Sequence, residues 1–314
     1  MLRRAAALVA LVSLVAACTD RDGDDTGAPT TEVGTTATTV TSAATVAGPT
    51  GSVTLGPGGR PAELVAPPDV VAPAPLVVLL HGYTATGATQ DAYLGITEQA
   101  ASRGLYVLLP DGTIDQRGNR FWDATGACCN FTGTSVDDVG YLRSLIEEAI
   151  EERPIDPARV YVLGHSNGGF MAYRLACEVP ELVTAIAVLA GSDVEGDEDC
   201  VPDGPPVSVL HLHGDADQVI PYEGGRTTAP FPGAVAVVAR WAARAGCGPE
   251  PVDGGRLDLD RAVDGAETVV HAYGGCGRGL AVQLDTLEGS VHTPPLEHEK
   301  VGTEVLDWLL ARTR

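Results

Sequence analysis

Short runs of apolar residues, each ending in a turn rich in glycine or polar residues, recur through the middle of the chain. Five of them predict strands, over 76–80, 104–110, 160–163, 185–189 and 207–212. Stretches with apolar residues at helical spacing lie between and after these runs, over 89–103, 136–152, 167–178, 234–245 and 297–312. Unbroken apolar runs are typical of strands buried on both faces. The alternation therefore predicts an α/β fold with a doubly wound, mostly parallel sheet.

The N-terminus has a different pattern. A basic start, Met1-Leu-Arg-Arg4, precedes an apolar stretch that is too short to span a membrane comfortably and ends in Val15-Ala-Ala-Cys18. This arrangement predicts a signal peptide over 1–17, and its end resembles the lipobox of bacterial lipoproteins, in which the cysteine is acylated. The alternative is an ordinary signal peptide whose cleavage site includes a cysteine. We predict an exported chain that is attached to the cell membrane through acylated Cys18 or released outside the cell.

Residues 18–59 are rich in Thr, Ala, Gly, Asp and Pro and contain no aromatic residue. Such a composition buries too little apolar surface to offset the entropy of ordering, so we predict a disordered tether. No break in composition follows, and the pattern predicts one folded domain over 60–314.

Acidic residues outnumber basic ones by 42 to 20, which gives a formal net charge of −22. Such a surface repels polyanions, so nucleic acid is excluded as a partner. The same charge leaves a lipid anchor as the only predicted contact with a membrane.

Seven cysteines are present, and acylation would use Cys18. Six cysteines then remain, and an even number in an exported chain predicts three disulfides, with fifteen alternative pairings. These cysteines are Cys128, Cys129, Cys177, Cys200, Cys247 and Cys276. Metal binding is the alternative, but no CxxC or HxxxH spacing accompanies them. We therefore expect no metal and no organic cofactor, and assign His211 and His213 to the end of a strand.

The segment Gly164-His-Ser-Asn-Gly168 directly follows one predicted strand and opens a predicted helix. This context makes G-x-S-x-G a candidate nucleophile elbow, with Ser166 exposed at the carboxyl end of the sheet. The backbone N–H of Asn167 would stabilise a developing oxyanion. A second donor is expected from Tyr83 N–H, since Gly82 allows close approach, although His81-Gly82 could be only a turn that ends a strand.

A serine nucleophile needs a base and an acid that orients the base. Asp215 and Asp217 both follow the strand 207–212, and either could instead cap a turn. Among the later histidines, His271 lies in an alternating strand and His298 in the last helix. His292 lies in a loop between a strand and that helix, and it is the predicted base.

Several motifs in the same order resemble the polyhydroxybutyrate depolymerase-like family of esterases, which includes feruloyl and acetylxylan esterases. The motifs are His81-Gly-Tyr83, Pro110-Asp-Gly-Thr113, Cys128-Cys-Asn130, Asp137-Asp-Val-Gly-Tyr141, the whole segment 160–177, His213-Gly-Asp-Ala-Asp217 and Gly289-Ser-Val-His292. The resemblance implies an α/β-hydrolase fold and a serine esterase that acts through Ser166, Asp217 and His292. It is also what favours Asp217 over Asp215 as the acid.

The resemblance further implies disulfides Cys177–Cys200 and Cys247–Cys276. Cys128 and Cys129 would then pair with each other or stay reduced. Relatives often carry tryptophan where this chain has Pro294. That difference falls beside the predicted base, so the leaving-group side of the pocket is expected to differ.

Loops at the carboxyl ends of parallel strands form the ligand crevice, so we consider His81 and Trp122 as candidate pocket residues. The alternative for Trp122 is that it covers the edge of the core. The predicted substrate is a small or oligomeric ester, of the feruloyl, acetyl or 3-hydroxyalkanoate type, with the oligomeric state of the protein left open. Two other functions remain, a peptidase or amidase that uses the same triad and a non-catalytic surface-binding lipoprotein on a hydrolase fold.

Overall fold

The computed structural model describes residues 51–194, 200 and 204–314. The predicted signal peptide, Cys18 and most of the predicted tether lie outside these residues. The strands are β1 (Val53–Leu55), β2 (Ala62–Val65), β3 (Ala74–Leu80), β4 (Tyr106–Leu109), β5 (Thr113–Ile114), β6 (Arg120–Phe121), β7 (Ile155–His165), β8 (Ala185–Leu189), β9 (Ser208–Gly214), β10 (Gly224–Arg226), β11 (Pro230–Pro232), β12 (Pro251–Leu257), β13 (Thr268–Tyr273) and β14 (Val282–Leu287). The helices are α1 (Gly87–Leu94), α2 (Ile96–Arg103), α3 (Asp138–Glu152), α4 (Asn167–Glu178), α5 (Ala234–Arg244), α6 (His298–Val301), the π-helical turn η2 (Gly302–Leu306) and α7 (Asp307–Leu310).

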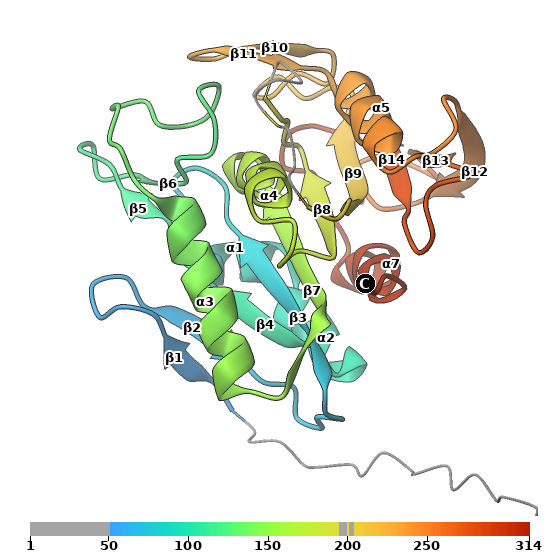
Figure 1. The fold of residues 1–314 in the computed structure, drawn as a ribbon. Coiled ribbons are helices and arrows are strands. Elements are labelled where there is room, and N and C mark those ends of the chain that lie inside the picture. The colour runs from blue at the N-terminus through green and yellow to red at the C-terminus, as the bar shows by residue number, and fades with distance from the viewer. Residues whose placement is uncertain (1–50, 195–199, 201–203) are drawn as a thin grey trace, which may run out of the picture. The chain divides into compact units, whose positions relative to one another are not determined.

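A ten-stranded sheet runs through the domain in the order β1-β2-β4-β3-β7-β8-β9-β14-β13-β12 (Figure 1). The six strands from β4 to β14 pair in parallel. The two strands at each end pair antiparallel with their neighbours. The predicted doubly wound, mostly parallel sheet is therefore confirmed.

Two apolar layers, one on each face of the sheet, form the core. Leu142 of α3, Phe170 of α4 and Trp241 of α5 belong to the same buried layer as Val78. The other layer contains Val77 together with buried residues of α1, α2 and the C-terminal helical segment. Neighbouring residues of β3 enter different layers because successive strand side chains point to opposite faces. Both faces of the central strands are thus covered, which explains their unbroken apolar runs.

The five predicted strands correspond to β3, β4, β7, β8 and β9. The helix predicted over 89–103 is wrong in one respect, because α1 ends and α2 begins at Gly95. Gly95 has a left-handed backbone, with φ of 66°, and this ends the first helix. A Cβ atom at this position would also collide with the His298 ring, so the break lets the last helical segment approach α1.

The predicted boundary at residue 60 is too late. β1 lies inside the segment predicted as tether and pairs with β2, with Val53 opposite Leu64 and Leu55 opposite Ala62. The Leu55 side chain is buried in the core. The folded part therefore begins by Val53, and three residues are too few to give a periodic signal in the sequence.

Three cysteine pairs are bonded, namely Cys177–Cys200, Cys247–Cys276 and Cys128–Cys129. They are the pairs that the family resemblance and subtraction implied. Within the described ranges, no helix is long and apolar enough to cross a membrane.

Candidate active site

Ser166 lies on the sharp turn between β7 and α4. Its backbone has φ of 55° and ψ of −118°, a region that residues with a side chain rarely occupy. Two backbone contacts hold this conformation: Ser166 N donates to Leu189 O at 2.9 Å, and Ser166 O accepts from Gly169 N at 2.8 Å. Glycine is required nearby, because a Cβ atom at Gly164 would collide with the carbonyl group of Gly168. The elbow geometry predicted from the sequence is thus present.

His292 links the serine to a carboxylate. Its Nε2 atom lies 2.9 Å from Ser166 Oγ, and its Nδ1 atom lies 2.7 Å from Asp217 Oδ2. A carboxylate only accepts hydrogen bonds, so Nδ1 carries the hydrogen and Nε2 is free to accept from the serine hydroxyl. This is the arrangement in which an imidazole can remove the serine proton.

Asp217 is held by more than the histidine. Its Oδ1 atom accepts from Val219 N at 2.8 Å and Ile220 N at 2.9 Å, and the residue is buried. Burial alone would raise the pKa of Asp217, but hydrogen bonds from His213, His292 and the backbone outweigh it and hold the pKa below its usual range. The carboxylate therefore stays charged beside His292.

Asp215, the alternative acid, lies elsewhere. It is exposed, and its Oδ1 atom accepts from Gly289 N at 2.6 Å. The structure thus brings Asp217, rather than Asp215, to His292, while Asp215 fastens the loop that leads to His292.

The two predicted oxyanion donors are the backbone N–H groups of Asn167 and Tyr83. Asn167 follows Ser166 in the chain, and Tyr83 lines the same pocket as Ser166. Asn167 is the first residue of α4, where helical N–H groups have no partner within the helix. Tyr83 follows Gly82, at which a Cβ atom would stand only 3.4 Å from Ser166 Cβ. Neither N–H donates to another group in the part of the chain that the structure describes. Both predicted oxyanion donors are therefore available.

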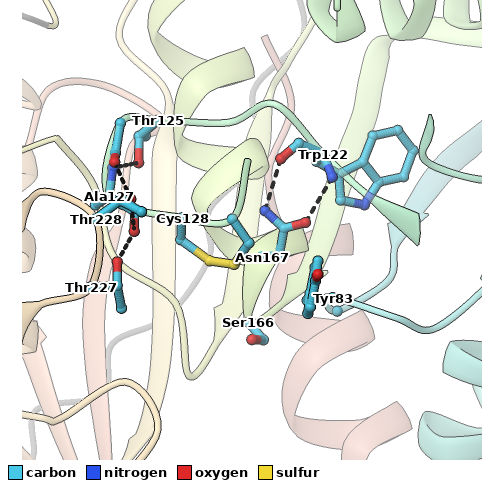
Figure 2. Close-up of a disulfide and its surroundings, with 12 residues drawn as sticks. Tyr83, Trp122, Thr125, Ala127, Cys128, Ser166, Asn167, Thr227 and Thr228 are labelled. Carbon is cyan, nitrogen blue, oxygen red and sulfur yellow. Dashed lines mark hydrogen bonds between the residues drawn. A yellow bond between two sulfur atoms is a disulfide. The ribbon is translucent and has the colours of Figure 1, made fainter. Parts of the chain in front are cut away.

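The Asn167 side chain has a separate task. Its Oδ1 atom accepts from Trp122 N at 2.7 Å, and its Nδ2 atom donates to Trp122 O at 3.0 Å. Figure 2 shows this double contact beside the Cys128–Cys129 disulfide, with Ser166 and Tyr83 close by. Asn167, the first residue of α4, thus anchors the loop that contains the disulfide.

The assignment of His81 and Trp122 to the pocket is wrong, because both side chains are completely buried. His81 Nε2 accepts from Gly112 N and its Nδ1 faces Gly82 O, both at 2.8 Å, while Trp122 Nε1 donates to His81 O at 3.0 Å. Burial also lowers the pKa of His81 to about 4, so the ring stays neutral. The two residues hold the loops behind the site and do not line the pocket. For Trp122 this agrees with the alternative that it covers the edge of the core.

A pocket of about 280 Å³ opens at the serine. Its lining comprises Gly82, Tyr83, Ala85, Thr89, Gln90, Tyr93, His165, Ser166, His292 and Thr293. The predicted nucleophile, base and one predicted oxyanion donor therefore share one cavity.

Two lining residues were not assigned a functional task from the sequence. His165 Nε2 lies 3.1 Å from the backbone oxygen of His292, and Tyr93 OH donates to Pro294 O at 2.7 Å. Burial lowers the pKa of His165 to about 4, so this ring is a neutral donor to the carbonyl group. Position beside the serine could have singled out His165. Tyr93 is 201 residues from its partner, and nothing in the local sequence points to the contact.

Comparison with known proteins identifies the fold family. A family described as the alpha/beta hydrolase fold matches residues 75–235. Feruloyl esterase B of Piromyces equi is 28% identical over 232 residues, 70% of this chain and 39% of that protein. Poly(3-hydroxyalkanoate) depolymerase C of Paucimonas lemoignei is 31% identical over 127 residues, 40% of this chain and 30% of that protein. The chain thus spans less than half the length of these curated relatives.

Solved structures show the same fold. The acetyl xylan esterase from Aspergillus awamori superposes with a TM-score of 0.56 at 18% identity, over 83% of this chain and 98% of that one. At this identity the likeness concerns the fold alone.

Proposed function

Because this chain belongs to the alpha/beta hydrolase fold family, we propose that it is a serine hydrolase that cleaves carboxylic esters. The observation that carries the proposal is the pair of contacts at His292, 2.9 Å to Ser166 Oγ and 2.7 Å to Asp217 Oδ2. Relatives named as esterases and as a depolymerase of a polyester favour an ester over an amide.

In the proposed reaction, Ser166 Oγ attacks the ester carbonyl carbon while His292 Nε2 takes its proton. The imidazolium then gives this proton to the leaving alkoxide, which departs as an alcohol. Water, deprotonated by His292, attacks the acyl-enzyme and releases the acid and the free serine. Asp217 holds the Nδ1–H tautomer and stabilises the imidazolium at both stages.

The negative charge on the carbonyl oxygen needs donors that are already in place. The N–H groups of Asn167 and Tyr83 are proposed for this, since neither donates to another described group. The α4 N-terminus adds a favourable dipole. The reaction uses only groups of this chain and water.

The proposed substrates are small or oligomeric esters of the feruloyl, acetyl or 3-hydroxyalkanoate type. Relatives named as a feruloyl esterase, an acetylxylan esterase/xylanase and a poly(3-hydroxyalkanoate) depolymerase suggest these classes. A pocket of about 280 Å³ suits one acyl or aryl group better than a long chain. Methyl ferulate, p-nitrophenyl acetate and 3-hydroxybutyrate oligomers would rank the classes by kcat/KM.

The proposal includes export and a lipid anchor at Cys18. Three disulfides within the described residues favour an oxidising compartment. Metabolic labelling with a fatty-acid analogue tests the anchor: the full chain should take up the label and fractionate with membranes, and Cys18→Ser should do neither. Equal labelling of both would rule out acylation at this residue.

The test of the activity is ester turnover by three variants, Ser166→Ala, His292→Ala and Asp217→Asn. Each should lower kcat by about 10⁴-fold or more, because the three side chains act as a unit. Matched controls lie outside the site, namely Ser144→Ala, His271→Ala and Asp264→Asn, and they should keep the wild-type rate.

Two results would contradict the proposal. Near wild-type turnover by Ser166→Ala would remove the nucleophile, and faster turnover of an anilide than of the matching ester would make the protein an amidase. A folded wild type that turns over none of these substrates would leave the non-catalytic binding protein as the remaining function.

A further inference from the structure

A line of buried side chains continues from the proposed triad acid into the core. His213 Nε2 lies 3.3 Å from Asp217 Oδ2 and 2.8 Å from the backbone oxygen of Ile220. His213 Nδ1 lies 3.1 Å from His211 Nε2, and His211 Nδ1 lies 2.8 Å from Tyr173 OH. All four residues of this line are buried, with at most 5% of their surface exposed: Asp217, His213, His211 and Tyr173.

Two elements place this line. His211 and His213 are two residues apart on β9, so their side chains lie on the same face of the sheet. Tyr173 reaches them from α4, the helix that begins directly after Ser166. The nucleophile helix and the strand that leads to the acid are therefore joined by side-chain hydrogen bonds.

The partners determine where each hydrogen lies. A carbonyl oxygen and a carboxylate only accept, so His213 Nε2 must carry a hydrogen. The Nδ1 atom of a neutral His213 then accepts from His211 Nε2–H. His211 Nδ1 accepts in turn from the Tyr173 hydroxyl. Every donor along the line points toward Asp217.

The opposite arrangement is less favourable. With a hydrogen on His213 Nδ1, His211 would have to donate to Tyr173, whose hydroxyl hydrogen would then have no acceptor among the described residues. Burial also lowers the pKa of His211 well below its usual value, so that ring stays neutral. A buried hydroxyl without an acceptor is costly, and this favours the order of donors from Tyr173 to Asp217.

We infer that His213 is a positioning residue for Asp217, held as an Nε2–H donor by His211 and Tyr173. This inference rests on the proposed function, because it concerns the acid of the proposed triad. Asp217 Oδ2 then lies against two fixed N–H groups, those of His292 at 2.7 Å and of His213 at 3.3 Å, and the His213 N–H group also reaches Ile220 O at 2.8 Å. The carboxylate cannot rotate without losing these contacts of Oδ2. Sharing its charge with a second donor also weakens its pull on the imidazolium of His292.

Other titratable groups border the line, and they are common to all variants described below. His165 contacts His292, and Tyr222 packs its ring edge-on against His213. Asp193 and Arg240 also influence the Tyr173 hydroxyl, the first raising its pKa and the second lowering it. A shift of the pH profile in a His213 or Tyr173 variant can therefore be assigned to the changed residue, because these neighbouring groups stay the same.

The first test is the tautomer, read from ¹H–¹⁵N correlation of the imidazole nitrogens in the full chain. His211 and His213 should both carry hydrogen on Nε2. A hydrogen on Nδ1 of His213 would overturn the inference. The tautomer measurement does not depend on turnover. A protein without esterase activity whose two rings both carry hydrogen on Nε2 would therefore contradict the proposed function but support His213 as a donor to Asp217.

The second test compares His213→Leu, which removes the donor, with His213→Gln, which retains an amide donor. In the leucine variant the acid limb of the kcat/KM profile should move up by about half a pH unit, because Asp217 then pulls harder on the imidazolium. Its kcat should fall about tenfold or more. The glutamine variant should recover most of the wild-type kcat and most of the wild-type position of the acid limb. An unchanged acid limb in a folded leucine variant would contradict the inference.

If the leucine variant does not fold, Tyr173→Phe decides. It removes only the last donor, so the acid limb should move in the same direction by a smaller amount. Tyr161→Phe is its matched control, since that buried hydroxyl donates to Arg312 O at 2.7 Å, away from Asp217. Equal pH profiles for the two phenylalanine variants would overturn the inference.

Discussion

The Nε2 atom of His165 lies 3.1 Å from the backbone oxygen of His292, so the residue before the proposed nucleophile holds the residue proposed as its base. The two rings also lie 5.2 Å apart. One turn of the chain at the end of β7 thereby presents the serine and fixes the loop that must reach it. Small shifts of that loop would change the distance between Nε2 of the base and Oγ of the serine.

Replacing His165 should therefore slow the reaction without removing any reacting group. His165→Phe loses the donor and should lower kcat by about 10–100-fold, since misplacing a catalytic group by about 1 Å costs on that order. His165→Gln can still donate and should recover much of the rate. Steady-state kinetics with p-nitrophenyl acetate measures this, and equal rates for both variants would show that the contact does not position His292.

Tyr93→Phe tests the second contact on the same loop. The change removes the hydrogen bond from the Tyr93 hydroxyl to Pro294 O, and kcat should fall by about 3–10-fold, a loss near 1 kcal/mol. Tyr141→Phe is the matched control, because its hydroxyl donates to Arg60 O and is not in the pocket lining. A larger loss of kcat in the Tyr141 variant would argue against this role of Tyr93.

Asn167→Asp should destabilise the protein more than Asn167→Ala does. Aspartate keeps the acceptor for Trp122 N but places a carboxylate oxygen against Trp122 O, where Asn167 now donates at 3.0 Å. The helix dipole favours an acid here by up to about 1 kcal/mol. A buried carboxylate with only one donor, whose second oxygen faces a carbonyl oxygen, costs about 3 kcal/mol or more, so the net effect is a loss. Urea unfolding at neutral pH measures both variants, and an aspartate variant as stable as the alanine variant would contradict this account.

Asp285 of β14 makes stability depend on pH. It is buried, and its Oδ2 atom has no partner among the described residues. Burial raises its pKa to about 7. Between the unfolded value near 4 and this value, the folded protein binds one proton more than the unfolded chain, so stability falls as pH rises. The slope is at most about 1.36 kcal/mol per pH unit.

Asp285→Asn should remove this dependence. The amide keeps an acceptor for Gln283 Nε2, which now donates to Asp285 Oδ1 at 2.8 Å. We expect the variant to gain about 2–4 kcal/mol in the free energy of unfolding at pH 8 and little at pH 4. Asp264→Asn, at an exposed position, controls for the lost charge. A gain that is the same at both pH values would show that Asp285 is ionised in the folded protein.

The central sheet could be predicted because its strands are buried on both faces and read as unbroken apolar runs. The outer strands give weaker signals. β12 has Gly254 and Gly255 and is mostly exposed, while β1 has three residues. Gly95 could have been identified as a helix end, but apolar spacing on both sides of it reads as one helix.

The site could be predicted where a motif fixes the local backbone, as it does around Ser166. Chain order narrowed the acid to Asp215 or Asp217, and the family resemblance favoured Asp217. The place of His292 in a loop before the last helix set it apart from the two other late histidines. His81 and Trp122 were misplaced because a loop at the carboxyl end of the sheet can point its side chains inward as well as into the pocket. Only packing reveals that Trp122 donates to His81 O behind the loop. The contacts of His165, Tyr93 and His213 depend on tertiary structure in the same way.

The central claim is that Ser166 is an activated nucleophile. The most direct measurement is reaction of the folded protein with a fluorophosphonate, followed by mass spectrometry of the peptide around 160–174. We expect one adduct, on Ser166, which is absent from Ser166→Ala and forms much more slowly in His292→Ala. No adduct on Ser166 in folded protein, or an adduct that persists in Ser166→Ala, would contradict it.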